Sequence, residues 1–243
     1  MSGLSLAGLF LWARDVSRAR AFYAQWKGWV EAEGGFRLPD GILWRVCSGR
    51  GNCSTRGPHG VVPALAVEDV AQAKAWLQAQ GRPLVFEEVV PGLARLTFID
   101  PEGNPVDVVQ EVDVAGWQRG QRIPAASDSS EPPRVLGLFE LSLYTHDVPR
   151  AQRVYQEGLG LTLGLAYFAH IHLLFDNVPL VLRPTWHRCP TQEPHTPALL
   201  LLGEALPTCR VEGLTWKPLN LCYTPCSGCH DGEYTWVCRM GEV

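Results

Sequence analysis

The chain has 243 residues, which favours two domains because one domain typically has about 100 to 200 residues. Its 46% hydrophobic and 19% charged residues exclude wholesale disorder and predict a globular protein. The formal net charge of -4, without a basic stripe, argues against nucleic acid as a partner. Because no apolar run approaches the roughly 18 residues of a membrane span and no leader peptide is evident, we expect no membrane association and a cytoplasmic location.

One helix-forming pattern occurs three times along the chain. It reads RDVSRARAFY at 14–23, EDVAQAKAWL at 68–77 and HDVPRAQRVY at 146–155. Each copy follows an apolar, strand-like run, and its aspartate suits the N-cap of a helix. Apolar residues then recur three and four positions apart, which predicts a helix that packs one face on a sheet.

Strand-like segments follow the first two helices, GILWRVC at 41–47 and then PLVFEEV, LARLTFI and PVDVVQ between 83 and 110. Each unit therefore reads as a strand, a helix and about three further strands. Residues 115–134 carry much Pro, Ser and Gly with little periodicity, which is typical of a linker. We predict a first domain at 1–114 with two units, the linker at 115–134, and a second domain at 135–243 with one clear unit and space for another.

The repeat and one turn together resemble a known superfamily. The opening segment at 9–23 and the DPEGNPVDV hairpin at 100–108 are similar to the vicinal oxygen chelate superfamily, which includes glyoxalase I, extradiol dioxygenases and bleomycin resistance proteins. The resemblance implies an α+β fold of tandem βαβββ modules, whose curled mixed sheets enclose cups, in two glyoxalase-like domains. Members that are enzymes hold a divalent metal in the cup through His, Gln or Glu, and the metal polarises vicinal oxygens of the substrate.

The resemblance also implies where metal ligands would stand. They lie about seven residues before a helix cap and about four after the glycine of DPxG, which gives Gly8, Val62 and Asp107 in the first domain. One carboxylate does not supply the several ligands that a retained transition metal needs. We therefore expect no metal cofactor in this domain.

Aromatic and small residues share the strand faces at these positions. Side chains alternate along a strand, so Phe10 and Trp12 share a face of the first unit, and Ala64 lies on the corresponding face of the second. We predict an apolar ligand-binding pocket from these three residues with Asp107 and Tyr144. The alternative is that they only fill the space between sheets.

Glu140 is a lone carboxylate in the apolar run LGLFELSLY, at the ligand position of the second domain. A buried charge is costly unless it is paired or coordinated. A metal site would combine Glu140 with His195, and His170, His172 or Glu233 could supply the third ligand for Fe, Mn, Ni or Zn. The alternative is a salt bridge from Glu140 to an arginine at the domain rim.

The composition changes after about residue 185, where the second domain is predicted to be degenerate or truncated. Six of the eight cysteines lie there, and CSGCH at 226–230 matches the haem-attachment pattern, although that chemistry normally requires export. A zinc site on Cys222, Cys226 and Cys229 with His230 or Cys238 is one alternative. A shifted reading frame is another.

Three functions remain open from the sequence. The leading hypothesis is a glyoxalase- or bleomycin-resistance-type protein with a metal-free apolar pocket for a small molecule. The second is a metal-dependent extradiol dioxygenase or glyoxalase-type lyase with its site in the second domain. The third is a degenerate scaffold for dimerisation, and a homodimer is compatible with all three.

Overall fold

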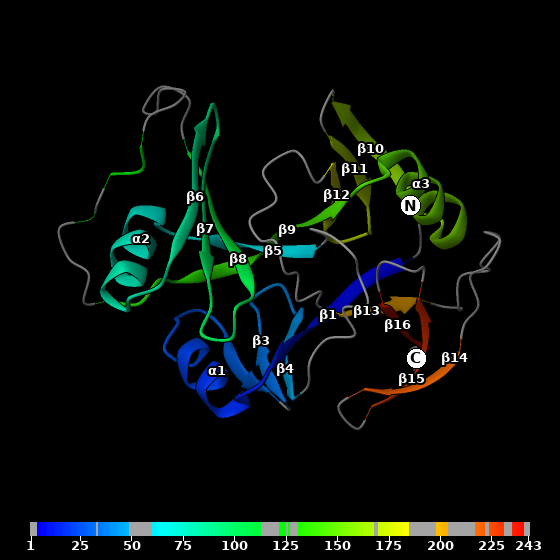
Figure 1. The fold of residues 1–243 in the computed structure, drawn as a ribbon, viewed down its shortest axis with the longest axis horizontal. Coiled ribbons are helices and arrows are strands. Elements are labelled where there is room, and N and C mark those ends of the chain that lie inside the picture. The colour runs from blue at the N-terminus through cyan, green and yellow to red at the C-terminus, as the bar shows by residue number, and fades with distance from the viewer. Residues whose placement is uncertain are drawn as a thin grey trace.

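The computed structural model describes residues 4–32, 34–48, 60–112, 122–124, 126, 131–167, 170–184, 198–203, 217–221, 224–230 and 235–240. The strands form two eight-stranded mixed sheets, accompanied by short helices (Figure 1). This arrangement confirms the predicted α+β class. Within these ranges, no helix is long and apolar enough to cross a membrane.

Four modules follow one another along the chain. The first consists of β1 (Leu4–Ala13), α1 (Val16–Tyr23), β2 (Val30–Ala32), β3 (Gly35–Arg37) and β4 (Leu43–Ser48). The second consists of β5 (Gly60–Val67), α2 (Val70–Ala79), β6 (Leu84–Val90), β7 (Leu93–Ile99) and β8 (Pro105–Glu111). The third consists of β9 (Val135–Thr145), α3 (Val148–Arg153), the π-helical turn η1 (Val154–Gly158), β10 (Thr162–Tyr167), β11 (His170–Leu174) and β12 (Pro179–Pro184). The fourth contributes β13 (Ala198–Gly203), β14 (Lys217–Leu221), β15 (Thr224–His230) and β16 (Thr235–Met240).

An aspartate caps each of the three repeated helices, as the sequence predicts. The side chains of Asp15, Asp69 and Asp147 each accept a hydrogen bond from a backbone N–H in the first turn, at 2.8 to 2.9 Å. The predicted apolar stripes are buried: they include Ala19, Phe22 and Tyr23 on α1, and Val70, Ala73, Trp76 and Leu77 on α2. Local sequence signals therefore determine where these helices begin and which face they bury.

Each sheet combines one module from each predicted domain. The first sheet has the order β14-β15-β16-β13-β1-β4-β3-β2, and the second has the order β10-β11-β12-β9-β5-β8-β7-β6. The joins are antiparallel pairs of first strands, β1 with β13 and β5 with β9. Module one thus shares a sheet with module four, and module two with module three. The predicted domain boundaries at 115–134 stay a prediction.

The segment after residue 185 contributes four strands to the first sheet. Cys226 and Cys229 lie on β15, and Cys238 lies on β16. The other candidates for metal chemistry in this segment that fall outside the described residues are His195, Cys222 and Glu233.

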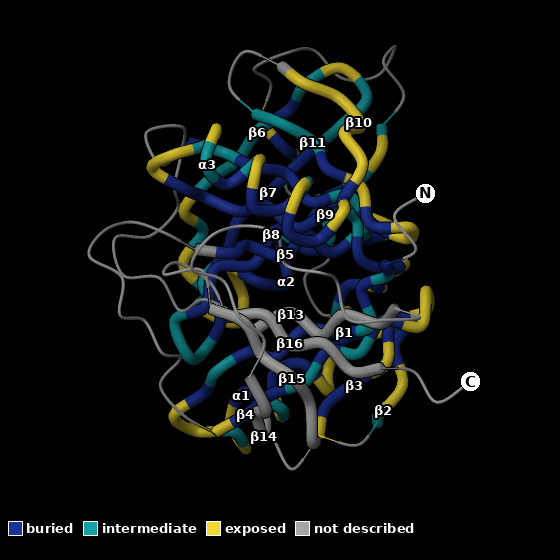
Figure 2. The backbone as a smooth tube through the Cα atoms, turned by 90° about the vertical axis from the view of Figure 1, so that its right-hand side faces the viewer, coloured by how far each residue is buried: buried dark blue, intermediate teal, exposed yellow. Residues whose placement is uncertain are grey.

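An aromatic core connects modules one and two, although they belong to different sheets. Phe22 of α1 lies 5.6 Å from Trp76 of α2 between ring centroids, and Trp26 lies 5.7 Å from Phe98 of β7. These rings belong to one continuous core cluster, and Figure 2 shows buried backbone running through both sheets. Such ring pairs add roughly 0.5 to 1.5 kcal/mol each beyond the area they bury.

The DPEGN turn between β7 and β8 attaches module two to the start of α1. The buried carboxylate of Asp100 accepts a hydrogen bond from the Tyr23 hydroxyl at 2.9 Å. Glu102 accepts hydrogen bonds from the Asp15 backbone N–H at 3.0 Å and from Arg18 Nε at 2.8 Å. Gly103 supplies the positive φ of 93° that the turn requires. The two sequence motifs behind the resemblance therefore bind each other.

The second sheet curls around its two central strands. In Figure 1, β6–β8 and β10–β12 rise on opposite sides of β5 and β9, and α2 and α3 lie on the outer sides. Helix α2 contacts β7 and β8, while α3 contacts β11 and β12. The face of the sheet away from these helices is therefore the inner, concave face.

Candidate functional site

Three candidate residues lie in one row across the centre of the second sheet. Ala64 of β5 is in register with Asp107 of β8 on one side and with Glu140 of β9 on the other. Because residues in register project to the same face, all three side chains point to one side. Both carboxylates are nearly inaccessible, at 2% and 3% exposure. The row therefore places two buried acids on either side of a side chain that is only a methyl group.

Arg95 of β7 connects the two acids. Its Nη1 donates to Asp107 Oδ2 at 3.0 Å, and its Nη2 donates to Glu140 Oε1 at 2.5 Å. The other oxygen of Asp107, Oδ1, accepts from the Thr97 hydroxyl at 2.6 Å. The guanidinium must extend past the two strands between β7 and β9 to reach Glu140, and the small side chain of Ala64 leaves it room.

A second arginine approaches Glu140 from the opposite side. Arg183 of β12 donates through Nη2 to Glu140 Oε1 at 3.0 Å and through Nε to the Ser142 hydroxyl at 2.9 Å. Ser142 in turn donates to the same oxygen of Glu140 at 3.0 Å. Glu140 Oε1 thus accepts three hydrogen bonds, and the network reaches from β7 to β12.

The charges in this network stabilise one another. Burial favours the neutral acid at Glu140, but Arg95 and Arg183 outweigh it and lower the pKa of Glu140 to about 2. Burial disfavours the charged guanidinium of Arg95 and so lowers its pKa. The two carboxylates outweigh burial, and the pKa of Arg95 is raised above its ordinary value. Burial raises the pKa of Asp107, against the charge of Arg95. Both oxygens of Asp107 accept hydrogen bonds, which is the pattern of an ionised carboxylate.

His172 of β11 extends the polar face. It is in register with Val181 of β12, two residues from Arg183. Burial and the neighbouring arginines lower its pKa, against the opposing charge of Glu140. The ring is therefore neutral at pH 7, and His170 packs against it with ring centroids 5.2 Å apart.

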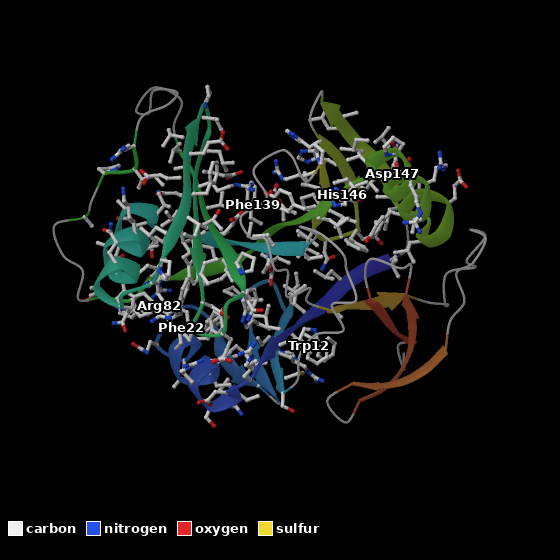
Figure 3. All side chains as sticks on the ribbon, viewed as in Figure 1. Trp12, Phe22, Arg82, Phe139, His146 and Asp147 are labelled. Atoms are coloured by element: carbon white, nitrogen blue, oxygen red, sulfur yellow. The ribbon has the colours of Figure 1, made fainter. Side chains whose placement is uncertain are left out.

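The structure brings together some of the predicted site residues and separates others. Ala64, Asp107 and Glu140 meet in the row, and Tyr144, four residues after Glu140 on β9, lies on the same face. Phe10 and Trp12 lie on β1 in the first sheet; Figure 3 shows Trp12 there, away from Phe139, the neighbour of Glu140. Phe10 and Trp12 therefore lie in a different sheet from Ala64, and a pocket lined by all three stays a prediction.

Phe10 lies beside an arginine of its own sheet. Phe10 is buried, and the Arg45 guanidinium of β4 lies 5.7 Å from the centroid of its ring. His195 falls outside the described residues. The salt bridge expected for Glu140 is present, but it is buried in the sheet centre and not at a domain rim.

The site residues that the sequence did not indicate are Arg95, Thr97, Ser142 and Arg183. One signal was available in the sequence. Arg95 and Thr97 stand two residues apart in the apolar strand LARLTFI, as Glu140 and Ser142 do in LGLFELSLY. Two polar residues at strand period in an apolar run indicate one polar face. Their partners were not readable, because they depend on which strands are neighbours.

The donor set does not fit the divalent metal that the fold family implies. Of the positions that the resemblance assigns to ligands on this sheet, Val62 offers none, and Asp107 and Glu140 are both bound to Arg95. Across the described residues, no group of three His, Cys, Asp or Glu side chains could hold a metal ion. A cation between the two carboxylates would have to displace the Arg95 guanidinium, which is already bound to both.

A separate surface hollow of about 310 Å³ lies where α1 meets the turn after α2. Phe22 and Arg82, both labelled in Figure 3, line it. Arg18, whose guanidinium is bound to Glu102, also lines it. The hollow contains none of the predicted site residues.

Comparison with known proteins shows the fold. No protein-family model matches the sequence, and no curated protein matches it at a significant level. Glyoxalase I from Zea mays matches with a TM-score of 0.61 at 14% identity, over 97% of this chain and 92% of that chain. A candidate dioxygenase from Bacillus subtilis matches with a TM-score of 0.63 at 12% identity, over 98% and 86%. The chain has the fold of the vicinal oxygen chelate superfamily.

Proposed function

We propose that the protein binds a small molecule, without a metal, on the concave face of the second sheet around Asp107, Ala64 and Glu140. It would then be a glyoxalase- or bleomycin-resistance-type binding protein. The observation that carries this proposal is the buried network of two arginines and two carboxylates. The site differs from the predicted pocket because it lies in the second sheet and is polar at its centre.

The energetics of the network support a role beyond stability. Replacing a buried ion pair by well-packed apolar residues is often neutral or stabilising by roughly 1 to 4 kcal/mol. Four ionised side chains on one face are therefore an expensive way to fill a core. They do provide polar groups in fixed orientations on rigid strands, surrounded by apolar residues such as Val62 and Val181, as ligand sites require.

The metal-enzyme alternative placed Fe, Mn, Ni or Zn on Glu140 and His195. Glu140 Oε1, which already accepts three hydrogen bonds, is poorly suited to a metal unless Arg95 or Arg183 moves away. The third alternative, a scaffold for dimerisation, stays a prediction. We therefore retain the binding function as the leading proposal.

The proposal is tested by locating bound fragments on the wild-type chain. Backbone amide shifts of the ¹⁵N-labelled protein are followed while a library of small polar aromatics is added, with and without a chelator. The proposal expects shifts at Ala64, Ser142 and Arg183 that the chelator leaves unchanged. Shifts confined to the region of Phe10 and Trp12, or binding that the chelator abolishes, would contradict it.

The proposed location is cytoplasmic, and it needs a separate test. Cys47 on β4 is disulfide-bonded, and disulfides persist mainly in oxidising compartments. Cell fractionation with an antibody against the chain decides between the cytoplasm and an oxidising compartment. Recovery from a secreted or periplasmic fraction would refute the cytoplasmic location.

A further inference from the structure

The surface hollow between α1 and the turn after α2 has an apolar floor. Its volume is about 310 Å³, and Phe22, Ala21 and Pro101 supply its apolar lining. Phe22 is only 6% exposed, and its ring packs against Trp76 and Phe98 of the aromatic core, so the floor is held in place. Since a cavity of about 150 Å³ holds benzene, the hollow has room for a single-ring ligand.

The helix ends at the hollow already have donors for two of their carbonyl oxygens. Carbonyls at a helix C-terminus carry partial negative charge and disfavour a bound anion. Gln25 Nε2 donates to the Ala21 carbonyl of α1 at 3.1 Å. Arg82 Nε donates to the Gln80 carbonyl after α2 at 3.2 Å. These acceptors are therefore satisfied by the chain itself and do not require a cation.

Two guanidinium groups line the hollow and keep donors that the fold does not use. Arg18 Nε donates to Glu102 Oε1 at 2.8 Å, and Arg18 Nη2 donates to the Pro101 carbonyl at 3.0 Å, which fixes this guanidinium in place. Within the described ranges, no hydrogen bond leaves Arg18 Nη1. Arg82 donates there only through Nε, so its two terminal nitrogens stay available to a ligand.

The charge around the hollow is positive. Among the described residues, no aspartate or glutamate lines it. Glu102 lies next to it and neutralises Arg18 at 2.6 Å, whereas Arg82 forms no ion pair with any residue that the structure describes. An anion therefore gains a charge-assisted hydrogen bond from Arg82, a cation is repelled, and a neutral ligand gains less than an anion.

We propose that this hollow binds a small aromatic carboxylate. The ring packs on Phe22 and Pro101, and the carboxylate accepts hydrogen bonds from the terminal nitrogens of Arg82 (Figure 3). Arg18 adds a second guanidinium, which Glu102 holds in position. The hollow is separate from the concave face of the second sheet, so the inference does not rest on the proposed function.

Three probes of similar shape test the charge selectivity. Benzoate is anionic at pH 7, benzamide is neutral and benzylamine is cationic. Each is titrated into the ¹⁵N-labelled full chain, and the backbone amides of Ala21, Gln25 and Gly81 are followed. We expect benzoate to shift these amides, with a Kd at least about tenfold below that of either other probe.

A first variant pair tests the contact with Arg82. Arg82→Gln removes the positive charge and the paired terminal nitrogens, so benzoate affinity should fall at least about tenfold. Arg37→Gln is the matched control, because Arg37 is also an arginine that donates to a backbone carbonyl, that of Gly41 at 3.0 Å, but lies outside the hollow. Its benzoate affinity should equal that of the wild type.

A second variant pair changes the charge of the lining from the other side. Ala21 is exposed on α1, so the helix tolerates a longer side chain there. Ala21→Glu and Ala21→Gln are equal in size and differ in charge. Benzoate should bind Ala21→Glu at least about fivefold more weakly than Ala21→Gln. This pair decides the question if Arg82→Gln does not fold.

Three results would overturn the inference. The first is that benzamide or benzylamine shifts the amides at the hollow at the same concentration as benzoate or at a lower one. The second is that Arg82→Gln binds benzoate as the wild type does, or that Arg37→Gln loses as much affinity. The third is that benzoate shifts no amide at the hollow. Shifts at Ala64 or Ser142 instead would bear only on the proposed function.

Discussion

Replacing Arg95 with methionine removes the guanidinium that holds both Asp107 and Glu140, while most of the apolar stem remains. Glu140 keeps Arg183 and Ser142 as partners after this change. Among the described residues, Asp107 keeps only the Thr97 hydroxyl as a hydrogen-bond partner. We expect a large loss of stability, because breaking a buried ion pair from one side typically costs about 3 to 5 kcal/mol.

The stability lost through Asp107 in this variant has an upper limit that depends on pH. Without Arg95, the buried carboxylate avoids its charge by binding a proton. Protonating a group with an ordinary pKa of 3.8 costs at most about 4 kcal/mol at pH 7 and about 2 kcal/mol at pH 5. In Arg95→Met the pKa of Asp107 is higher in the folded state than in the unfolded state. The stability of the variant therefore falls as the pH rises from 3.8 towards the folded pKa. The Arg95→Met penalty should therefore be smaller at pH 5.

Urea unfolding at pH 7 and pH 5, followed by the fluorescence of the buried core tryptophans, measures both quantities. Arg82→Met is the control, because Arg82 has no part in the network, and it should cost less than about 0.5 kcal/mol at either pH. An Arg95→Met penalty below about 1 kcal/mol at pH 7 would refute the reasoning. A penalty that is the same at both pH values would refute the proposed protonation of Asp107.

Three further predictions follow from single contacts. Lowering the pH from 4.5 to 2 should reduce the unfolding free energy of the wild type by about 3 kcal/mol, because the folded pKa of Glu140, about 2, lies below the ordinary 4.5. Acid unfolding of Glu140→Gln should lack this loss. Ala64→Leu should cost about 1 to 3 kcal/mol or more, because the added side chain occupies the space that Arg95 crosses. Thermal melts should show a smaller loss for Ala66→Leu, since Ala66 is only partly buried on the same strand. Tyr23→Phe should cost about 1 to 2 kcal/mol in urea unfolding, and no loss would mean that its bond to the DPEGN turn is unimportant.

Local signals were sufficient for the modules. An aspartate before an apolar 3.6-residue stripe defines a helix start within one stretch of chain, so Asp15, Asp69 and Asp147 could be assigned from the sequence. The turn at 100–104 was equally local. These features depend on residues a few positions apart, and the structure confirms them.

The partition of modules between sheets could not be predicted in the same way. The first strands of the modules are all predominantly apolar, so the sequence does not say that β5 pairs with β9 and not with β1. That pairing places Glu140 beside Ala64 and brings Arg95, 45 residues earlier in the chain, within 2.5 Å of it. Glu140 was recognisable as an unusual buried charge, but its partners were determined by strand order.

The metal content of protein purified without an affinity tag, in the wild type and in Glu140→Ala, tests the arginine-centred site most directly. We predict no stoichiometric Fe, Mn, Ni or Zn bound through Glu140, because Arg95 and Arg183 already neutralise the two carboxylates. Zinc that survives the mutation would come from the cysteine-rich segment and leave the site unaffected. One equivalent of metal in the wild type that disappears in Glu140→Ala would contradict the account and make the second sheet a metal-enzyme site.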